Sequence, residues 1–160
     1  AYSERKQPWI CVSEKQNRII VISDFNTKII ERLLQGALNA FSYYNGLDKN
    51  MQIFHVPGAF EIPGAINQVL KYHSPNAIIA LGSIIRGETP HFDYIAGESA
   101  RGLSKLIQSV DFPIINGILT TDNVHQAMER SDINKKNKGW DAMEAALQTI
   151  STYQSIQDSV

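Results

Sequence analysis

The sequence has little cysteine and no long apolar run. Its 160 residues include one cysteine, Cys11, which cannot form an internal disulfide and is typical of an intracellular protein. No stretch approaches the roughly 20 apolar residues that a membrane-spanning helix needs. The start of the chain is too polar for a secretory signal peptide. We therefore expect a cytoplasmic protein with no membrane partner.

An excess of one charge and metal-binding patterns are also missing. Lysine and arginine number 15, aspartate and glutamate 16, and the formal net charge is -1, with no dense basic cluster. A nucleic-acid partner is therefore not expected. The sequence has no CxxC pair and no histidine-rich spacing, so we expect no metal site.

What the chain does have is a regular alternation of apolar strands and amphipathic helices. The patterns predict strands over residues 18–23, 51–56, 76–85 and 112–119, and helices over residues 26–46, 59–73, 91–110, 123–130 and 140–154. Strands that are apolar on both faces are typical of a parallel sheet covered by helices. We predict an α/β three-layer αβα sandwich with a four-stranded parallel sheet in the flavodoxin-like order 2-1-3-4.

The length and a hydrophobic content of 43% suit a single domain over residues 1–160. Residues 1–17 are expected to be a polar leader, whose apolar stretch WICV adds a strand to a neighbouring subunit. The tail over residues 154–160 is expected to fray.

Polar segments follow all four predicted strands. They read SDFN, VPGAFEIP, IIRGETPHF and NGILTTDN. Because ligands of open α/β sheets bind at the carboxyl ends of the strands, we expect these segments to meet at one edge. There they bring together an aromatic ring (Phe25), a carboxylate (Glu61) and a histidine (His91), which together suit a flat polar ring and a phosphate.

Each of these residues also has a simpler interpretation. An aromatic residue after a strand, such as Phe25, is more often a plug of the core. Glu61 is explained by a favourable interaction with a helix dipole, and His91 by capping or plain solvation at a helix start. Arg130 could belong to a solvated charged stretch. The shared location of these groups at one edge favours a binding site over these separate explanations.

Four ordered motifs strengthen the binding-site hypothesis. VPGAFEIP, ALGSIIRGETPHFDYI, GILTTDN with QAMER, and NKG before the last helix resemble the motifs of the lumazine synthase (6,7-dimethyl-8-ribityllumazine synthase) family, from about Arg18 to Tyr153. The resemblance implies a transferase of riboflavin biosynthesis that needs neither a metal nor an organic cofactor. Its small-molecule substrates would be 5-amino-6-(D-ribitylamino)uracil and 3,4-dihydroxy-2-butanone 4-phosphate. It also implies a homo-oligomer built on a pentamer, with sites shared between subunits.

The resemblance assigns a role to each matching position. His91 would transfer protons, and Phe25 would stack on the pyrimidine ring. The other substrate-binding positions would be Ala59, Phe60 and Glu61 for the ribityl chain, Ser83, Ile84 and Ile85 for the ring, Glu88 and Thr89 for the ketone, Arg130 for its phosphate, and Asn116 and Lys138.

The sequence departs from the family pattern at three positions. Asn116 stands where many members have an aromatic residue that a neighbouring subunit lends to the site. Asn134 replaces a frequent lysine, and Asp24 replaces a frequent arginine. These departures concern phosphate affinity and assembly more than reaction type.

Two other functions are compatible with the pattern. A non-catalytic flavin- or lumazine-binding protein could use the same scaffold after the rim of the site had changed. A flavodoxin-like redox protein would have similar alternation, but the segment SDFNTK after the first strand is not a compact phosphate loop.

Overall fold

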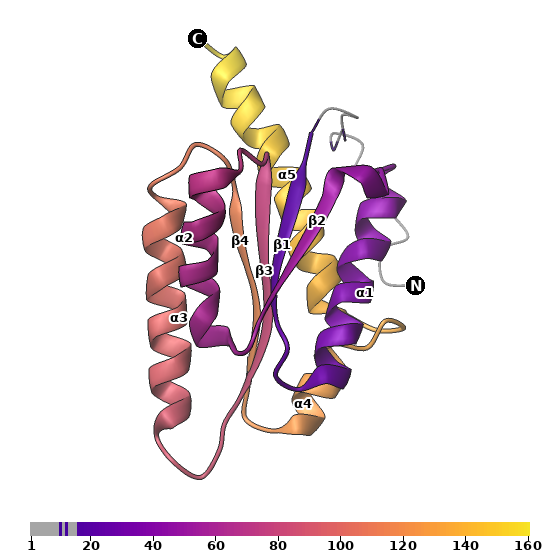
Figure 1. Ribbon diagram of the computed structural model, residues 1–160. Coiled ribbons are helices and arrows are strands. Elements are labelled where there is room, and N and C mark those ends of the chain that lie inside the picture. The colour runs from indigo at the N-terminus through magenta and orange to yellow at the C-terminus, as the bar shows by residue number, and fades with distance from the viewer. Residues whose placement is uncertain (1–9, 11, 13–15) are drawn as a thin grey trace.

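Four parallel strands form one sheet, with helices on both of its faces (Figure 1). The computed structural model describes residue 10, residue 12 and residues 16–160. The strands are β1 (Arg18–Ser23), β2 (Met51–Val56), β3 (Ala77–Ile85) and β4 (Ile114–Thr121), and their order is β2-β1-β3-β4. The predicted three-layer fold and strand order are confirmed.

Alternate residues of the central strands supply two cores, one on each face of the sheet. The helices are α1 (Thr27–Tyr43), α2 (Ile62–Tyr72), α3 (His91–Ile107), α4 (Val124–Arg130) and α5 (Lys138–Asp158), with short 3-10 helices η1 (Asp48–Asn50) and η2 (Ala59–Glu61). In β1, Ile20 and Ile22 belong to the core under α1 and α5, whereas Ile19 and Val21 belong to the core under α2 and α3. The period-2 alternation of strand side chains produces this division.

The two central strands, β1 and β3, are buried along nearly their whole length. The edge strands β2 and β4 are less completely buried, and each has two exposed side chains. The expectation of strands apolar on both faces therefore holds for the centre of the sheet, where helices cover both sides.

The ends of several elements differ from the sequence prediction. Helix α5 covers residues 138–158, not 140–154, and β4 is shifted along the chain. This strand covers residues 114–121, not 112–119, because Thr120 and Thr121 continue the pairing with Ile84 and Ile85. β-branched threonine suits an extended strand. Helix α4 begins at Val124, one residue after the predicted start. Asn123 is its cap residue, and its side chain accepts a hydrogen bond from the backbone N–H of Gln126.

Both ends of the chain carry expectations that stay predictions. Trp9 and Cys11 of the leader lie outside the described residues, and Ile10 and Val12 pack against the core of their own chain. Helix α5 continues to Asp158 with exposed side chains from Gln154 onward. Fraying of this end would have to overcome only the hydrogen bonds of the helix itself.

Asn137 joins three segments where α5 begins. Its side-chain oxygen accepts from the backbone N–H of Trp140 at 2.9 Å, and its amide donates to the carbonyl oxygens of Ser131 at 2.7 Å and Arg32 at 3.0 Å. The residue is buried. One side chain thus caps α5 and fastens it to α1 and to the end of α4.

We predict that Asn137→Ala lowers the free energy of unfolding by about 3 kcal/mol, because it leaves several buried backbone groups without a partner. Urea denaturation at one fixed protein concentration measures the change. Asn123→Ala is the matched control, since it removes an exposed cap with a single hydrogen bond and should cost about 1 kcal/mol. Equal losses in the two variants would contradict the joining role of Asn137.

Arg18 is an unusual buried residue at the start of β1. Its side chain is 1% exposed, and its Nη2 donates to Gln16 at 2.8 Å. The Nε and Nη1 atoms have no hydrogen-bond partner among the residues that the structure describes. Burial lowers the pKa of Arg18 to about 10. A lowered pKa in a basic group means that folding disfavours the charged form, so charged Arg18 lowers stability at every pH below about 10.

We predict that Arg18→Met raises the free energy of unfolding by about 1 kcal/mol at neutral pH, because it removes a poorly compensated buried charge and keeps most of the volume. Arg18→Ala removes the same charge but leaves a cavity beside Phe41, and it should lower stability. Urea titrations of both variants test this. A loss of stability in Arg18→Met would show that the charge is well paired in the folded protein.

Candidate active site

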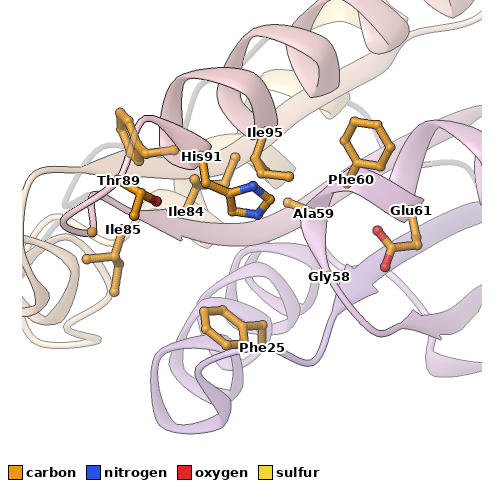
Figure 2. A pocket seen from close by; sticks show the side chains of 12 residues that line it. Phe25, Gly58, Ala59, Phe60, Glu61, Ile84, Ile85, Thr89, His91 and Ile95 are labelled. Atoms are coloured by element: carbon orange, nitrogen blue, oxygen red, sulfur yellow. The ribbon is translucent and has the colours of Figure 1, made fainter.

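A cavity of about 340 Å³ lies at the edge of the sheet where β1, β2 and β3 end (Figure 2). Five parts of the chain line it: the β1–α1 loop, η2 with the residue before it, the end of β3, the β3–α3 loop and the first turns of α3. The lining residues are Phe25, Gly58, Ala59, Phe60, Glu61, Ile84, Ile85, Gly87, Thr89, His91, Phe92 and Ile95. The expected gathering of the strand-end segments is therefore found for three of the four strands.

Phe25 lies in the loop between β1 and α1. Its side chain is 63% exposed, so the interpretation as a core plug is wrong. The next residue, Asn26, has a φ of 64°, a left-handed conformation that asparagine tolerates better than most residues. Figure 2 shows the Phe25 ring on one side of the cavity and the His91 imidazole on the facing side.

Helix η2 forms a second wall of the cavity. Ala59 is buried, and its carbonyl oxygen accepts from the hydroxyl of Ser99 in α3 at 3.3 Å. Phe60 is 54% exposed, and Glu61 occupies the cap position of α2 without a side-chain capping hydrogen bond. Its carboxylate lies beside Gly58, at the margin of the cavity. Glu61 therefore has a carboxylate that a ligand can reach.

The end of β3 offers main-chain groups to the cavity. The pairing of β1 with β3 stops at Ile22 and Leu81, whereas β4 pairs with β3 as far as Ile85. The last residues of β3 therefore extend past β1 and leave their backbone on that side without a strand partner. Ile84 and Ile85 line the cavity there, while the Ser83 side chain is buried away from it.

His91 is the first residue of α3 and is exposed to the cavity. The preceding residue, Pro90, occupies the cap position and accepts from the backbone N–H of Asp93 at 3.0 Å. Figure 2 shows the imidazole near the centre of the group of labelled side chains. A ligand held between Phe25 and α3 would therefore meet a group that can donate or accept a proton.

Arg86 fixes the segment before His91 to its surroundings. Its guanidinium lies 4.4 Å from the ring centroid of Phe92, its Nε is 3.0 Å from Asp122, and its Nη1 is 3.7 Å from Asp93. These contacts join α3 to the turn after β4. Arg86 and the lining residues Gly58, Gly87, Phe92 and Ile95 were not among the predicted site residues. The spacing of Ile95, one helical turn after His91, was the available signal for that residue.

Other expected site residues lie elsewhere in the same chain. Arg130 and Lys138 line a separate cavity of about 230 Å³ with Lys136 and Asp141, and it shares no residue with the first. Asn116 is exposed on the edge strand β4, where its oxygen accepts from the backbone N–H of Ile118. Glu88 is exposed and does not line the first cavity. One subunit therefore brings together part of the expected site only.

The first cavity has few charged side chains in its lining. Of the residues that the structure describes, one carboxylate and one histidine line it, but neither lysine nor arginine does. Within the described part of the chain, no three histidine, cysteine, aspartate or glutamate side chains are grouped so that they could hold a metal ion. None of the helices in that part is both long and apolar enough to cross a membrane.

Comparison with known proteins identifies relatives along nearly the whole chain. The model of the 6,7-dimethyl-8-ribityllumazine synthase family matches residues 15–154. A protein of that name from Campylobacter hominis is 38% identical over 148 residues, covering 92% of this chain and 95% of that protein. One from Protochlamydia amoebophila is 47% identical over 131 residues, covering 82% of this chain and 76% of that protein.

A third relative of the same name, from Nitratiruptor sp., is 40% identical over 137 residues, which is 86% of this chain and 89% of that protein. Family match, identity and coverage agree with one another and with the fold. The chain therefore belongs to the 6,7-dimethyl-8-ribityllumazine synthase family, the transferases that make the lumazine of riboflavin biosynthesis.

Proposed function

We propose that this chain condenses 5-amino-6-(D-ribitylamino)uracil with 3,4-dihydroxy-2-butanone 4-phosphate to form 6,7-dimethyl-8-ribityllumazine, phosphate and water. The observation that carries the proposal is the cavity at the sheet edge, in which Phe25 and His91 face each other in a member of this family. The alternative of a non-catalytic binding protein has no support in the comparisons, since the three relatives described above are named as the synthase.

In this proposal the first cavity holds the pyrimidine substrate. Phe25 stacks on the ring, and the unpartnered backbone of Ser83, Ile84 and Ile85 forms hydrogen bonds with its edge. The ribityl chain lies along η2, where the backbone of Ala59 and Phe60 and the carboxylate of Glu61 meet its hydroxyl groups. Three phenylalanine rings in the lining and open main-chain groups suit a flat polar molecule with a flexible polyol.

The reaction itself places modest demands on the protein. The substrate amine attacks the ketone and water leaves to form a Schiff base. Elimination of phosphate gives an enol that tautomerises to a new carbonyl group, and the ribitylamino nitrogen closes the ring on this carbonyl with loss of another water. The nucleophile and leaving group belong to the substrates, so holding them aligned supplies most of the acceleration. His91 moves the protons of these steps, and Glu88 and Thr89 contact the ketone. General acid–base catalysis of this kind contributes about 10²- to 10⁴-fold.

We propose further that a neighbouring subunit completes the site in a homo-oligomer built on a pentamer. A phosphorylated ketone carries negative charge, and among the residues that the structure describes no lysine or arginine lines the first cavity to balance it. Arg130, Lys136 and Lys138 instead surround a second cavity with one carboxylate, that of Asp141. If these two surfaces face each other across a subunit contact, the basic side chains that bind the substrate phosphate come close to the neighbour's His91.

The edge of the sheet supports the same arrangement. β4 is an edge strand, and Asn116 and Thr120 are exposed on it. Repeated head-to-tail contacts between two different surfaces of one chain generate closed rings, such as a pentamer. In such a ring Asn116, Arg130 and Lys138 of one subunit contact the substrate held by the next. We propose a cytoplasmic location, as expected for a biosynthetic enzyme with one cysteine.

We predict that mixing the two substrates with the wild-type protein produces lumazine absorbance and fluorescence. His91→Ala should lower kcat by about 10- to 10³-fold, because the aligned substrates retain most of the acceleration. The dissociation constant of a ribityl-pyrimidine analogue should change by less than about twofold, because His91 contributes to proton transfer and little to affinity. An inactive wild-type protein would refute the proposed reaction, and an unchanged kcat in the variant would remove His91 from it.

We predict that His91→Ala and Arg130→Ala subunits complement each other. When the two variants are unfolded, mixed equally and refolded together, about a quarter of the sites should combine an intact His91 with the neighbour's intact Arg130. Activity at low ketone concentration should rise towards that fraction of the wild-type value, and sedimentation should show a species based on five chain masses. Mixtures no more active than the separate variants, or an active monomer, would contradict the shared site.

A further inference from the structure

The ring of Phe25 has to be held in place by its loop. At 63% exposure the side chain has little packing of its own, so the backbone of residues 24–26 sets its position. A stacking platform is useful only when its plane stays at the correct distance from the ligand. Any contact that fixes this loop therefore affects binding of the ring substrate.

The loop is attached to β2, the outer neighbour of β1. The backbone N–H of Asp24 donates to the carbonyl oxygen of Val56 at 2.8 Å, which continues the β1–β2 ladder by one step. The Asp24 carboxylate also lies 2.7 Å from Nδ1 of His55. The first contact needs no particular side chain, whereas the second depends on both residues. The two contacts together fix Asp24 immediately before Phe25.

On the other side of Phe25, the chain turns sharply into α1. Asn26 adopts its left-handed conformation there, and its carbonyl oxygen accepts from the backbone N–H of Ile30 at 3.1 Å. Asn26 is the cap residue of α1, but its side chain forms no capping hydrogen bond. The Thr27 hydroxyl donates weakly across this turn to the carbonyl oxygen of Asp24 at 3.4 Å. Phe25 thus lies between a helix start and an attachment that the shorter contact between His55 and Asp24 reinforces.

We propose that His55 and Asp24 are positioning residues for Phe25, and that their contact raises affinity for the ring substrate without acting on the chemistry. The inference rests on the proposed function, in which Phe25 stacks on the pyrimidine. Neither residue lines the cavity, so both act through the loop. The ketone is held by α3 and by the neighbouring subunit, and its binding is independent of this contact.

The expected effect is small and selective. The two side chains are 51% and 58% exposed, and losing an exposed pair of this kind changes an equilibrium constant by up to about fivefold. His55→Leu and Asp24→Ala should each raise the Michaelis constant for the pyrimidine by about that factor. The Michaelis constant for the ketone and kcat should stay within about twofold of the wild-type values. The double variant should be no worse than either single one, because both remove the same contact.

His55→Asn supplies the rescue. Its amide nitrogen occupies nearly the place of the imidazole Nδ1 and can donate to Asp24, so the Michaelis constant for the pyrimidine should return to within about twofold of wild type. The matched control is His125→Leu in α4, which removes a comparable exposed contact, from His125 to Glu129 at 3.5 Å, that involves no residue of the loop or of β2. This control should leave both Michaelis constants unchanged.

Steady-state kinetics of the full-length oligomer, with analogue binding and thermal melting of each variant, test the proposal. Equal increases for both substrates, a His55→Asn variant as weak as His55→Leu, or additive single effects would overturn it. If His55→Leu fails to fold, Asp24→Ala and His55→Asn give the same comparison. Failure of the proposed function is distinguishable, because the wild-type protein itself would then neither form lumazine nor bind the analogue.

Discussion

The pairing of β3 on both sides is the constraint on which the rest of the molecule depends. β3 has nine residues, is buried over residues 77–84, and lies between β1 and β4. Because it is longer than β1, its end extends beyond the shorter strand and leaves main-chain groups open at the edge of the sheet. The same end of β3 leads through a short loop into α3. The strand therefore supplies part of the cavity wall, through Ile84 and Ile85, and places His91 at the start of the next helix.

The fold could be predicted from the sequence because its signals are local and repeated. Apolar β-branched runs followed by helical spacing gave the correct elements, and burial of both faces gave the parallel sheet. Errors arose where two local signals compete. The segment TTDN contains good helix-start residues, yet its threonines stay in β4 because pairing with Ile84 and Ile85 outweighs a capping preference that Asn123 already satisfies. Phe25 was misjudged when taken alone because residue type gives average burial, whereas the loop conformation at Asn26 decides its exposure.

The candidate site was predictable only in part, because some of its residues are placed by local topology and others by contacts between distant parts of the chain. Residues that directly follow strands can be assigned to one edge from topology, and Phe25, Glu61 and His91 meet there. Arg130 and Lys138 come from the last two helices, whose placement depends on contacts over a hundred residues apart in the chain, such as that between Asn137 and Arg32. The role of Arg86 was not predicted, because it depends on contacts with Phe92, Asp93 and Asp122 in the folded chain. No spacing in the sequence indicates that these residues meet.

The triplet Asn137–Lys138–Gly139 shows what a short family motif can encode. Asn137 is buried at a junction of helices, and a Cβ atom on Gly139 would overlap the carbonyl oxygen of Leu33 in α1. Two of the three letters thus describe how closely α5 approaches α1, and only Lys138 reaches the cationic cavity. Such a signature records architecture and chemistry in the same three positions. A mutational scan scored by activity alone would count all three as functional, and parallel measurement of protein abundance would separate the lysine from its two structural neighbours.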